Sequence, residues 1–217
     1  MSAPDLFEST ITGGIPLRNE PVQARSTARL AALLDAAAGV IDEIGYERLT
    51  TAMVAERAGA SIGTVYRYFP DRIAVLQALG ARNLERVMTR VHEEINSEAH
   101  SNWVEALSAS FGVLIEFFRS EPGYRSLRVG DVIDLHPTTV ERPYYSFVAD
   151  VLYDGLVRRF GVADTSDARF SFETALVVSD ALASRAFARD AEGDAEFLNA
   201  SRDITYSMLV PHFGEPA

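Results

Sequence analysis

A cluster of hydrogen-bond donors at helical spacing is the first feature of this sequence with chemical potential. Within residues 62–68, IGTVYRY, the donors are Thr64, Tyr66, Arg67 and Tyr68. Hydroxyl and guanidinium groups donate hydrogen bonds to phosphate oxygens and to base edges, and the three hydroxyls do so without adding charge. Gly63 has no side chain and would let a backbone come close to another surface. These residue types fit the noncovalent recognition of an acceptor-rich partner.

Two short helices are predicted to position these donors. The first runs over Thr50 to Ala58, with Thr50 or Thr51 as its N-cap residue. Gly59 follows at the point where a left-handed residue ends a helix. Two short helices joined by such a glycine-containing turn form a helix-turn-helix, whose second helix enters the DNA major groove.

Ser61 is predicted to cap the second helix, which covers residues 62–68. Val65 and Phe69 are apolar at a spacing of four and would face the core, which leaves the donors for the other surfaces. Pro70 and Asp71 then end this helix and start a third one. A helical corner that merely packs is the alternative, but it does not explain a glycine and so many donors on one short helix.

Residues 24–81 resemble the N-terminal domain of the TetR family of transcriptional repressors, over roughly a quarter of the chain. The matching residues, in order, are Leu33-Leu34-Asp35-Ala36-Ala37, Gly45-Tyr46, Leu49-Thr50-Thr51, Val54-Ala55, Ala58-Gly59, Gly63-Thr64-Val65-Tyr66, Tyr68-Phe69 and Arg72. The resemblance implies an all-α fold, in which a three-helix helix-turn-helix domain precedes a helical domain for ligand binding and dimerisation.

The resemblance also implies roles for individual residues. Thr51 and Tyr66 would contact phosphates, and Arg72 stands where the family usually has a phosphate-binding lysine. Ala52 cannot hydrogen-bond to a base, and Ile62 could touch only a thymine methyl group or pack. The expected DNA-binding residues are therefore Thr51, Ile62, Gly63, Thr64, Tyr66, Arg67, Tyr68 and Arg72, with readout resting mainly on Thr64, Arg67 and Tyr68.

The net charge of −11 is unusual for a DNA-binding protein, but the acidity is unevenly distributed. Residues 1–80 carry 7 arginines and 9 acids, whereas residues 81–217 carry 13 arginines and 22 acids. An acidic body would repel DNA and limit contact to one face of the molecule. The absence of cysteine excludes disulfides, no apolar run is long enough to span a membrane, and no secretory signal is seen, so we expect a cytoplasmic protein.

Enzymatic function finds no support in the sequence. The four histidines are scattered, and no nucleophile motif, phosphate-binding loop or cofactor motif is present. Asp131, Asp134 and His136 lie close enough in sequence for a metal site to be imagined, but no metal-ligand spacing supports one. We therefore expect no enzyme, no cofactor and no metal.

Three regions are predicted along the chain: a disordered arm over residues 1–23, the DNA-binding domain over 24–71 with its motif at about 50–69, and a helical domain over 72–217. Arg18 and Arg25, at the end of the arm, could reach a phosphate or a minor groove, although an untethered tail is the simpler interpretation. The helical domain should contain a long helix from Arg72 to about Ser97, and a last helix from Ala195 to Val210 that Pro211 stops.

Small residues in the helix over 166–189 suggest close packing with a second copy of the chain, so that the last two helices would form a dimer interface. Aromatic residues concentrate between residues 111 and 172, where the resemblance implies a small, largely apolar effector. The candidate pocket residues are Phe111, Phe118, Tyr124, Arg128, Tyr145 and Phe172. Most of these aromatics must nevertheless be ordinary core.

These expectations predict a homodimeric, DNA-binding transcriptional regulator, a repressor that a small-molecule effector releases from a palindromic operator in double-stranded DNA. The alternative is a DNA-binding architectural or division-related protein of the same fold without an effector. A helical protein that does not touch DNA would require the motif to be a coincidence.

Overall fold

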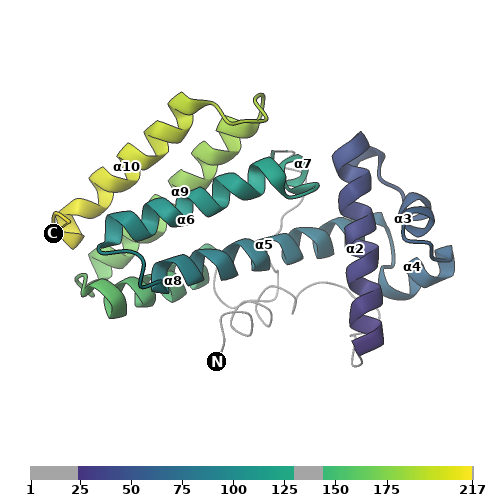
Figure 1. Cartoon of the computed structure of the whole chain (residues 1–217), viewed down its shortest axis with the longest axis horizontal. Coiled ribbons are helices and arrows are strands. Elements are labelled where there is room, and N and C mark those ends of the chain that lie inside the picture. The colour runs from purple at the N-terminus through teal and green to yellow at the C-terminus, as the bar shows by residue number, and fades with distance from the viewer. Residues whose placement is uncertain (1–23, 130–143, 217) are drawn as a thin grey trace. The chain divides into compact units, whose positions relative to one another are not determined.

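The computed structural model describes residues 24–129 and 144–216, and every regular element in these two ranges is a helix (Figure 1). The expected arm over residues 1–23 lies outside the described residues, as do Asp131, Asp134 and His136. The helices are α2 (Ala24–Ile44), α3 (Thr51–Arg57), α4 (Ile62–Tyr68), α5 (Arg72–Asn96), α6 (Trp103–Ser120), α7 (Tyr124–Val129), α8 (Tyr144–Phe160), α9 (Ser166–Phe187) and α10 (Ala195–Phe213), with a 3₁₀ turn, η1 (Tyr46–Arg48), before α3.

The chain divides into two compact units, and α5 runs from one into the other. The described part of the N-terminal unit comprises residues 24–85 and 121–129, and that of the C-terminal unit comprises residues 86–120 and 144–216. This division falls between residues 85 and 86, inside α5, whereas the sequence predicts a domain boundary at residue 72. The sequence could not place it, because the apolar repeat of α5 continues without interruption through both units.

The core of the N-terminal unit gathers apolar residues from α2, α3, α4 and the first turns of α5. Leu33, Ile41, Val54 and Val65 are fully buried there, together with Phe69 directly after α4. Burial of such side chains is the main source of stability for a small helical unit. The face of α4 that carries Val65 is thereby fixed inward, and this decides which of its side chains remain outside.

Helix α7 belongs to the N-terminal unit although it follows α6 in the sequence. Leu127 joins the core cluster, and the Gly123 amide donates to the Asp42 carboxylate on α2 at 3.4 Å. Gly123 has φ +73°, and a Cβ there would meet the Ala38 carbonyl oxygen of α2 at 3.2 Å. A glycine is required at this position both by the backbone conformation and by the close approach of α2.

A continuous series of ring contacts joins four helices of the C-terminal unit. Trp103 of α6 stacks on Tyr206 of α10 at 5.8 Å and meets Phe213 edge-on at 5.2 Å between ring centroids. Tyr153 of α8 then contacts both Phe213 and Phe172 of α9, at 5.7 and 5.4 Å. These geometries are the favourable ones for aromatic pairs, so the series holds the unit together beyond simple burial.

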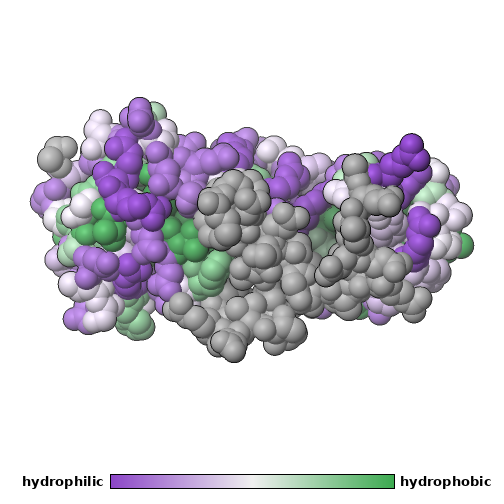
Figure 2. All heavy atoms as spheres, turned by 90° about the horizontal axis from the view of Figure 1, so that it is seen from below, coloured by the Kyte–Doolittle hydropathy of each residue, from purple (hydrophilic) through white to green (hydrophobic). Residues whose placement is uncertain are grey.

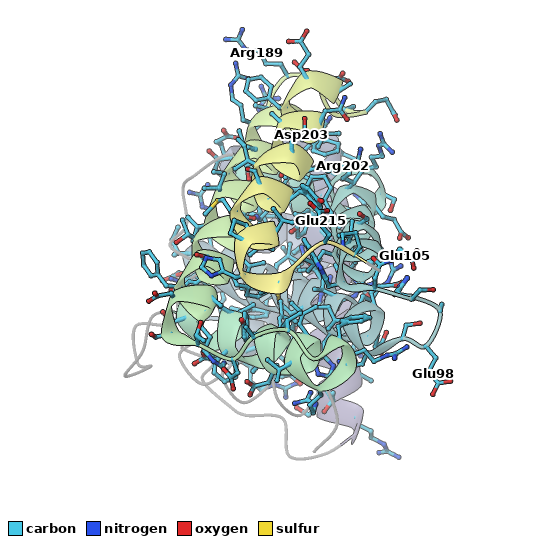
Figure 3. The ribbon with its side chains drawn as sticks, turned by 90° about the vertical axis from the view of Figure 1, so that its left-hand side faces the viewer. Glu98, Glu105, Arg189, Arg202, Asp203 and Glu215 are labelled. Carbon is cyan, nitrogen blue, oxygen red and sulfur yellow. The ribbon has the colours of Figure 1, made fainter. Side chains whose placement is uncertain are left out.

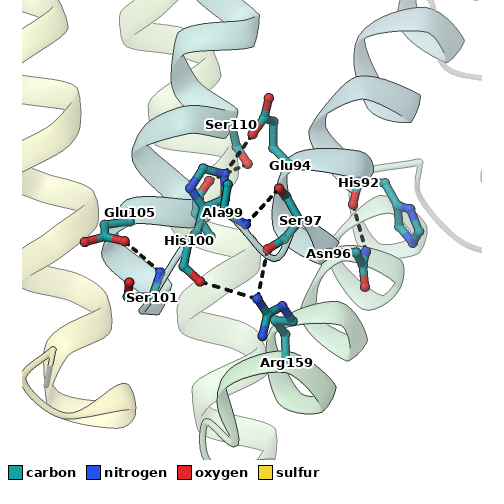
Figure 4. Close-up of polar contacts among 11 residues, drawn as sticks. His92, Glu94, Asn96, Ser97, Ala99, His100, Ser101, Glu105, Ser110 and Arg159 are labelled. Carbon is teal, nitrogen blue, oxygen red and sulfur yellow. Dashed lines mark hydrogen bonds and ion pairs between the residues drawn. The ribbon is translucent and has the colours of Figure 1, made fainter.

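The turn between α5 and α6 is fastened by polar contacts (Figure 4). Arg159 of α8 donates to the carbonyl oxygens of Ser97 and His100, at 3.1 and 3.5 Å. The His100 ring lies 2.8 Å from the Glu94 carboxylate. Helix α8 also passes close to α5, since a Cβ on Gly155 would meet the Ile95 side chain at 2.9 Å.

The end of the last helix differs from the expectation. Pro211 does not stop α10, which continues to Phe213 and ends at Gly214 with φ +78°. A proline in the last turn removes one backbone donor only, and the Gly214 amide closes the helix on the Val210 carbonyl at 2.9 Å. Among the described residues no helix is long and apolar enough to cross a membrane.

Candidate nucleic-acid interface

Side-chain caps fix where the two helices of the motif begin, and a glycine turn joins them. The Thr50 hydroxyl accepts a hydrogen bond from the Met53 amide at 3.2 Å, and the Ser61 hydroxyl accepts one from the Thr64 amide at 3.1 Å. Between them Gly59 adopts φ +58°. The expected caps and turn are confirmed, and α4 begins and ends at the predicted residues, Ile62 and Tyr68.

The outer face of α4 presents apolar and polar side chains to solvent together. Ile62 is 43 % exposed and Tyr66 is 44 % exposed. Thr51, at the start of α3, donates to the Tyr66 hydroxyl at 3.4 Å. The two residues expected to contact phosphates are therefore side by side, one from each helix of the motif.

Gly63 occupies an open position. Its backbone is helical, and a Cβ added there would find no atom nearer than the Ser61 hydroxyl at 3.8 Å. The packing of the protein therefore does not require a glycine, although glycine costs up to about 1 kcal/mol relative to alanine in a helix. Its absence of a side chain keeps the outer surface of α4 accessible at backbone level.

Thr64 and Arg67 are both placed by neighbouring side chains. The Thr64 hydroxyl lies 2.9 Å from the Ser61 hydroxyl, so part of its hydrogen-bonding capacity is used at the cap. Arg67 is exposed, and its guanidinium lies over the Tyr68 ring, 5.4 Å from the ring centroid. Such a cation–π contact restricts the side chain without neutralising its charge.

Tyr68 does not lie on the exposed face, contrary to the expectation. It is only 3 % exposed, and its hydroxyl lies 3.0 Å from the hydroxyl of Ser26, the third residue of α2. The helical period places residue 68 three positions after Val65, so its ring turns toward the core with that residue. The three-residue spacing from Val65 indicates this burial in the sequence, but the hydroxyl of Tyr68 favoured a surface position.

Arg72 is also engaged within the protein. Its guanidinium donates to the Glu47 carbonyl oxygen in η1 at 2.6 Å, which ties the start of α5 to the turn before α3. A guanidinium has five N–H donors, so this bond leaves others for a phosphate. Arg72 thus positions the motif in addition to any contact it makes with a partner.

A second pair holds α3 against α2. Arg57 donates to both carboxylate oxygens of Glu43, at 2.7 and 2.5 Å, and its guanidinium passes within 3.0 Å of where a Cβ on Gly39 would stand. The bonds from Arg57 lower the pKa of the Glu43 carboxyl. This bidentate pair was not foreseen, because partners fourteen residues apart on two helices share no sequence pattern.

The residues proposed for an effector pocket belong to two different units of the chain. Phe118 stacks on Phe187 at 4.7 Å, Phe172 belongs to the ring series described above, and Phe111 lies under the Arg202 guanidinium at 5.4 Å. These three are in the C-terminal unit, whereas Tyr124 and Arg128 are in the N-terminal unit. Tyr145 lies in α8, but its side chain is outside the described part of the chain.

Within residues 24–129 and 144–216, no group of three or more histidine or acidic side chains is arranged to hold a metal ion. The charged cluster around Arg169 contains three carboxylates, but each is bonded to that arginine: Asp150, Asp154 and Asp164, at 3.5, 2.7 and 2.7 Å. It is an ion-pair network that links α8 to α9.

A capped helix-turn-helix with an exposed, glycine-bearing second helix defines a DNA-binding regulator, and the comparisons with known proteins agree. Residues 33–79 match the model of bacterial regulatory proteins of the tetR family, and residues 101–213 match the tetracyclin repressor-like C-terminal domain. The chain belongs to the TetR family of transcriptional regulators. The family is one of DNA-binding transcriptional regulators.

Solved and curated relatives are similar over different lengths. A TetR-family regulator from Streptomyces coelicolor is 31 % identical, with 85 % of this chain and 97 % of that one covered and a TM-score of 0.68. The repressor KstR of Rhodococcus jostii is 41 % identical over 58 residues, 27 % of each chain. The nucleoid occlusion factor SlmA of Alteromonas mediterranea is 28 % identical over 109 residues, 50 % of this chain and 55 % of that protein. The chain thus spans about half the length of this last relative, or less in the case of KstR.

Proposed function

We propose that this regulator is a repressor that binds a palindromic operator as a homodimer and is released by a small-molecule effector. The observation that carries the DNA-binding part is the outer face of α4, where Gly63 leaves the backbone open between the exposed side chains of Ile62 and Tyr66. In this proposal Ile62 and Arg67 approach base edges, and Thr51, Tyr66 and Arg72 hold phosphates.

Dimerisation through α9 and α10 is supported by side chains other than those expected. The small residues Ala168, Ala175, Ala183 and Ala186 are buried inside the protomer, and Ser179 bonds to Thr205 of α10 at 2.7 Å. They allow α9 to approach its own neighbours, so the expectation that they face a partner is wrong.

Three large apolar side chains remain outside on these two helices: Phe170, Val177 and Ile204, at 71, 43 and 38 % exposure. Phe170 and Val177 are seven residues apart and share one face of α9. Figure 2 shows hydrophobic residues at the surface of the C-terminal unit on another side of the molecule, which is seen there from below, so exposed apolar side chains are not confined to α9 and α10. Exposed apolar side chains on a face of this kind favour a contact with a second copy.

The effector proposal rests on the family's C-terminal domain and on the aromatic content of α6, α8 and α9. Among the described members of the candidate set Phe111 and Arg128 are partly exposed, and Phe111 lies beside the cationic Arg202. We propose an apolar effector bound by the C-terminal unit, with α5 as the helix that connects effector binding to the motif. DNA and effector would then weaken each other's binding by the same factor.

A second candidate is favoured by the similarity to nucleoid occlusion factors, which covers half of this chain. A protein of that kind would bind DNA with the same motif at several chromosomal sites, without an effector. Both candidates place the protein with the chromosome in the cytoplasm. They differ in how selective the binding is and in whether a small molecule changes it.

The test is fluorescence anisotropy of the purified protein on the DNA that flanks its own gene, with scrambled DNA as competitor and at two salt concentrations. Selective, salt-sensitive binding is expected, and a later screen of apolar small molecules should release the DNA. Equal affinity for specific and scrambled DNA, unaffected by any small molecule, would instead support the second candidate.

A further inference from the structure

The burial of Tyr68 has a consequence for the surface beside it. Tyr68 contacts α2 and its own neighbour in α4: its hydroxyl lies 3.0 Å from the Ser26 hydroxyl, and its ring lies under the Arg67 guanidinium at 5.4 Å. The tyrosine therefore fixes the beginning of α2 next to the end of α4, the helix proposed to enter the major groove (Figure 1).

The beginning of α2 carries two arginines, which we call the α2 arginine pair: Arg25 and Arg29. They stand one residue before Ser26 and three after it, and both are exposed. A spacing of four places them on one face of the helix. Within the described part of the chain neither guanidinium forms an ion pair or hydrogen bond, in contrast to Arg57, Arg82 and Arg169.

Charges are segregated along α2. Its acids, Asp35, Asp42 and Glu43, all lie in its second half, where Arg82 binds Asp35 at 2.6 Å and Arg57 binds Glu43. Residues 24–34 contain no acid, and neither does α4. In a protein with a net charge of −11, the α2 arginine pair and Arg67 thus make a local cationic surface around Tyr68.

We propose that the α2 arginine pair contacts backbone phosphates of the DNA that flanks the bases read by α4, and that the Tyr68–Ser26 contact positions it. Because this inference rests on the proposed DNA-binding function, its partner is double-stranded DNA. Two exposed guanidinium groups suit this role, since phosphate contacts supply affinity and orientation without reading sequence. Their affinity should depend strongly on salt, because each contact releases bound counterions.

The experiment compares salt dependence in three proteins on a short duplex from the flanking DNA. The test variant is Arg25→Ala/Arg29→Ala, and the control is Arg125→Ala/Arg189→Ala, which removes the same charge from two other exposed arginines. Arg125 is in α7, and Arg189 stands beyond the end of α9 (Figure 3). Circular dichroism verifies that each variant is folded.

Between about 50 and 200 mM salt, we expect the slope of log affinity against log salt to become shallower by about 2 for each bound motif in the test variant, with little change in the control. Test and control variants with equal slopes would overturn the proposal. If the wild-type protein itself shows no salt-sensitive binding, the proposed DNA-binding function fails, which is a different result.

Tyr68→Phe separates positioning from direct contact, because it keeps the ring and removes the hydroxyl bond to Ser26. It should make the salt slope shallower in the wild-type background and have no further effect in the Arg25→Ala/Arg29→Ala background. An equal effect in both backgrounds would show that Tyr68 does not act through the α2 arginine pair.

Discussion

At the scale of single residues, Gly63 distinguishes the motif from an ordinary helical corner, because a glycine there makes the helix less stable than an alanine would. Gly63 lies in a helix with free space around it, and nothing in its own fold requires a glycine. Tyr68 shows the reverse, since a residue with the chemistry of a DNA contact is buried against Ser26. Residue type alone does not show that Gly63 is open to a partner and Tyr68 is buried, but the atoms around each residue do.

Gly63→Ala should therefore change stability and function in opposite directions. The added methyl group meets no atom within 3.8 Å and favours the helix, so the melting temperature should stay the same or rise. The same methyl group would push the DNA away from α4, and we expect affinity to fall about tenfold or more, or about 1.4 kcal/mol. Differential scanning fluorimetry and anisotropy measure the two effects. Unchanged affinity would show that no backbone approaches Gly63.

Tyr66 and Arg67 should separate affinity from specificity. Tyr66→Phe removes a hydroxyl assigned to a phosphate, so binding should weaken by a similar factor on every sequence. Arg67→Ala removes a proposed base contact and should cost about 1–3 kcal/mol on the preferred site while relaxing selectivity there. Binding to a randomised DNA library, followed by sequencing, reports both. A uniform loss for Arg67→Ala would assign this residue to the backbone instead.

At the scale of elements, arginines fasten helices to one another in both units. Arg57 joins α3 to α2, Arg72 joins α5 to η1, Arg159 joins α8 to the α5–α6 turn, and Arg169 joins α9 to α8. These guanidinium groups bind carboxylates or backbone carbonyl oxygens, and a planar fork with five N–H donors suits both kinds of partner. The positions of the helices depend on these contacts as well as on apolar packing.

The Arg169 network predicts a pH-dependent contribution to stability. Its hydrogen bond lowers the pKa of the Asp164 carboxyl below the ordinary value of 3.8. A group with a lowered folded-state pKa stabilises the protein above its ordinary pKa and ceases to do so as the pH falls through the lowered value. Arg169→Gln should thus lower the melting temperature by a few degrees at neutral pH, with the difference shrinking below about pH 4. A constant difference across this range would assign the effect to packing over the Tyr153 ring.

At the scale of the whole molecule, reading a palindrome requires two motifs in a fixed arrangement, which a dimer supplies. Phe170, Val177 and Ile204 of α9 and α10 are large apolar residues that the packing of the C-terminal unit does not bury. Figure 3 shows α10 in front, with Arg202 and Asp203 among the labelled charged residues on this helix. Apolar side chains bordered by charges are typical of an interface with a polar rim.

Val177→Glu combined with Ile204→Glu should produce monomers, because two carboxylates would be buried in the proposed interface. Light scattering after gel filtration gives the mass, and anisotropy should show affinity for a palindromic site falling by a factor of about 100 or more as the second motif is lost. Ser108→Glu on the exposed side of α6 is the control. A dimeric double variant would place the interface elsewhere.

The sequence by itself determined the features that depend on neighbouring residues. The caps Thr50, Ser61 and Asp71, the left-handed Gly59, and the limits of α4 all follow from hydrogen bonds and backbone preferences within a few residues, so local patterns predict them. Membership of the family was visible for the same reason, since the motif is short and its residues are nearly contiguous.

Only the tertiary structure decided what depends on segments far apart in the chain. The burial of Tyr68 requires Ser26, forty-two positions away, and the inclusion of α7 in the N-terminal unit requires Gly123 to meet α2. The small residues of α9 pack inward because neighbours within the same protomer reach them. Such contacts come from the packing of whole helices, whose free energy is shared among many side chains and leaves no periodic signal in any one of them.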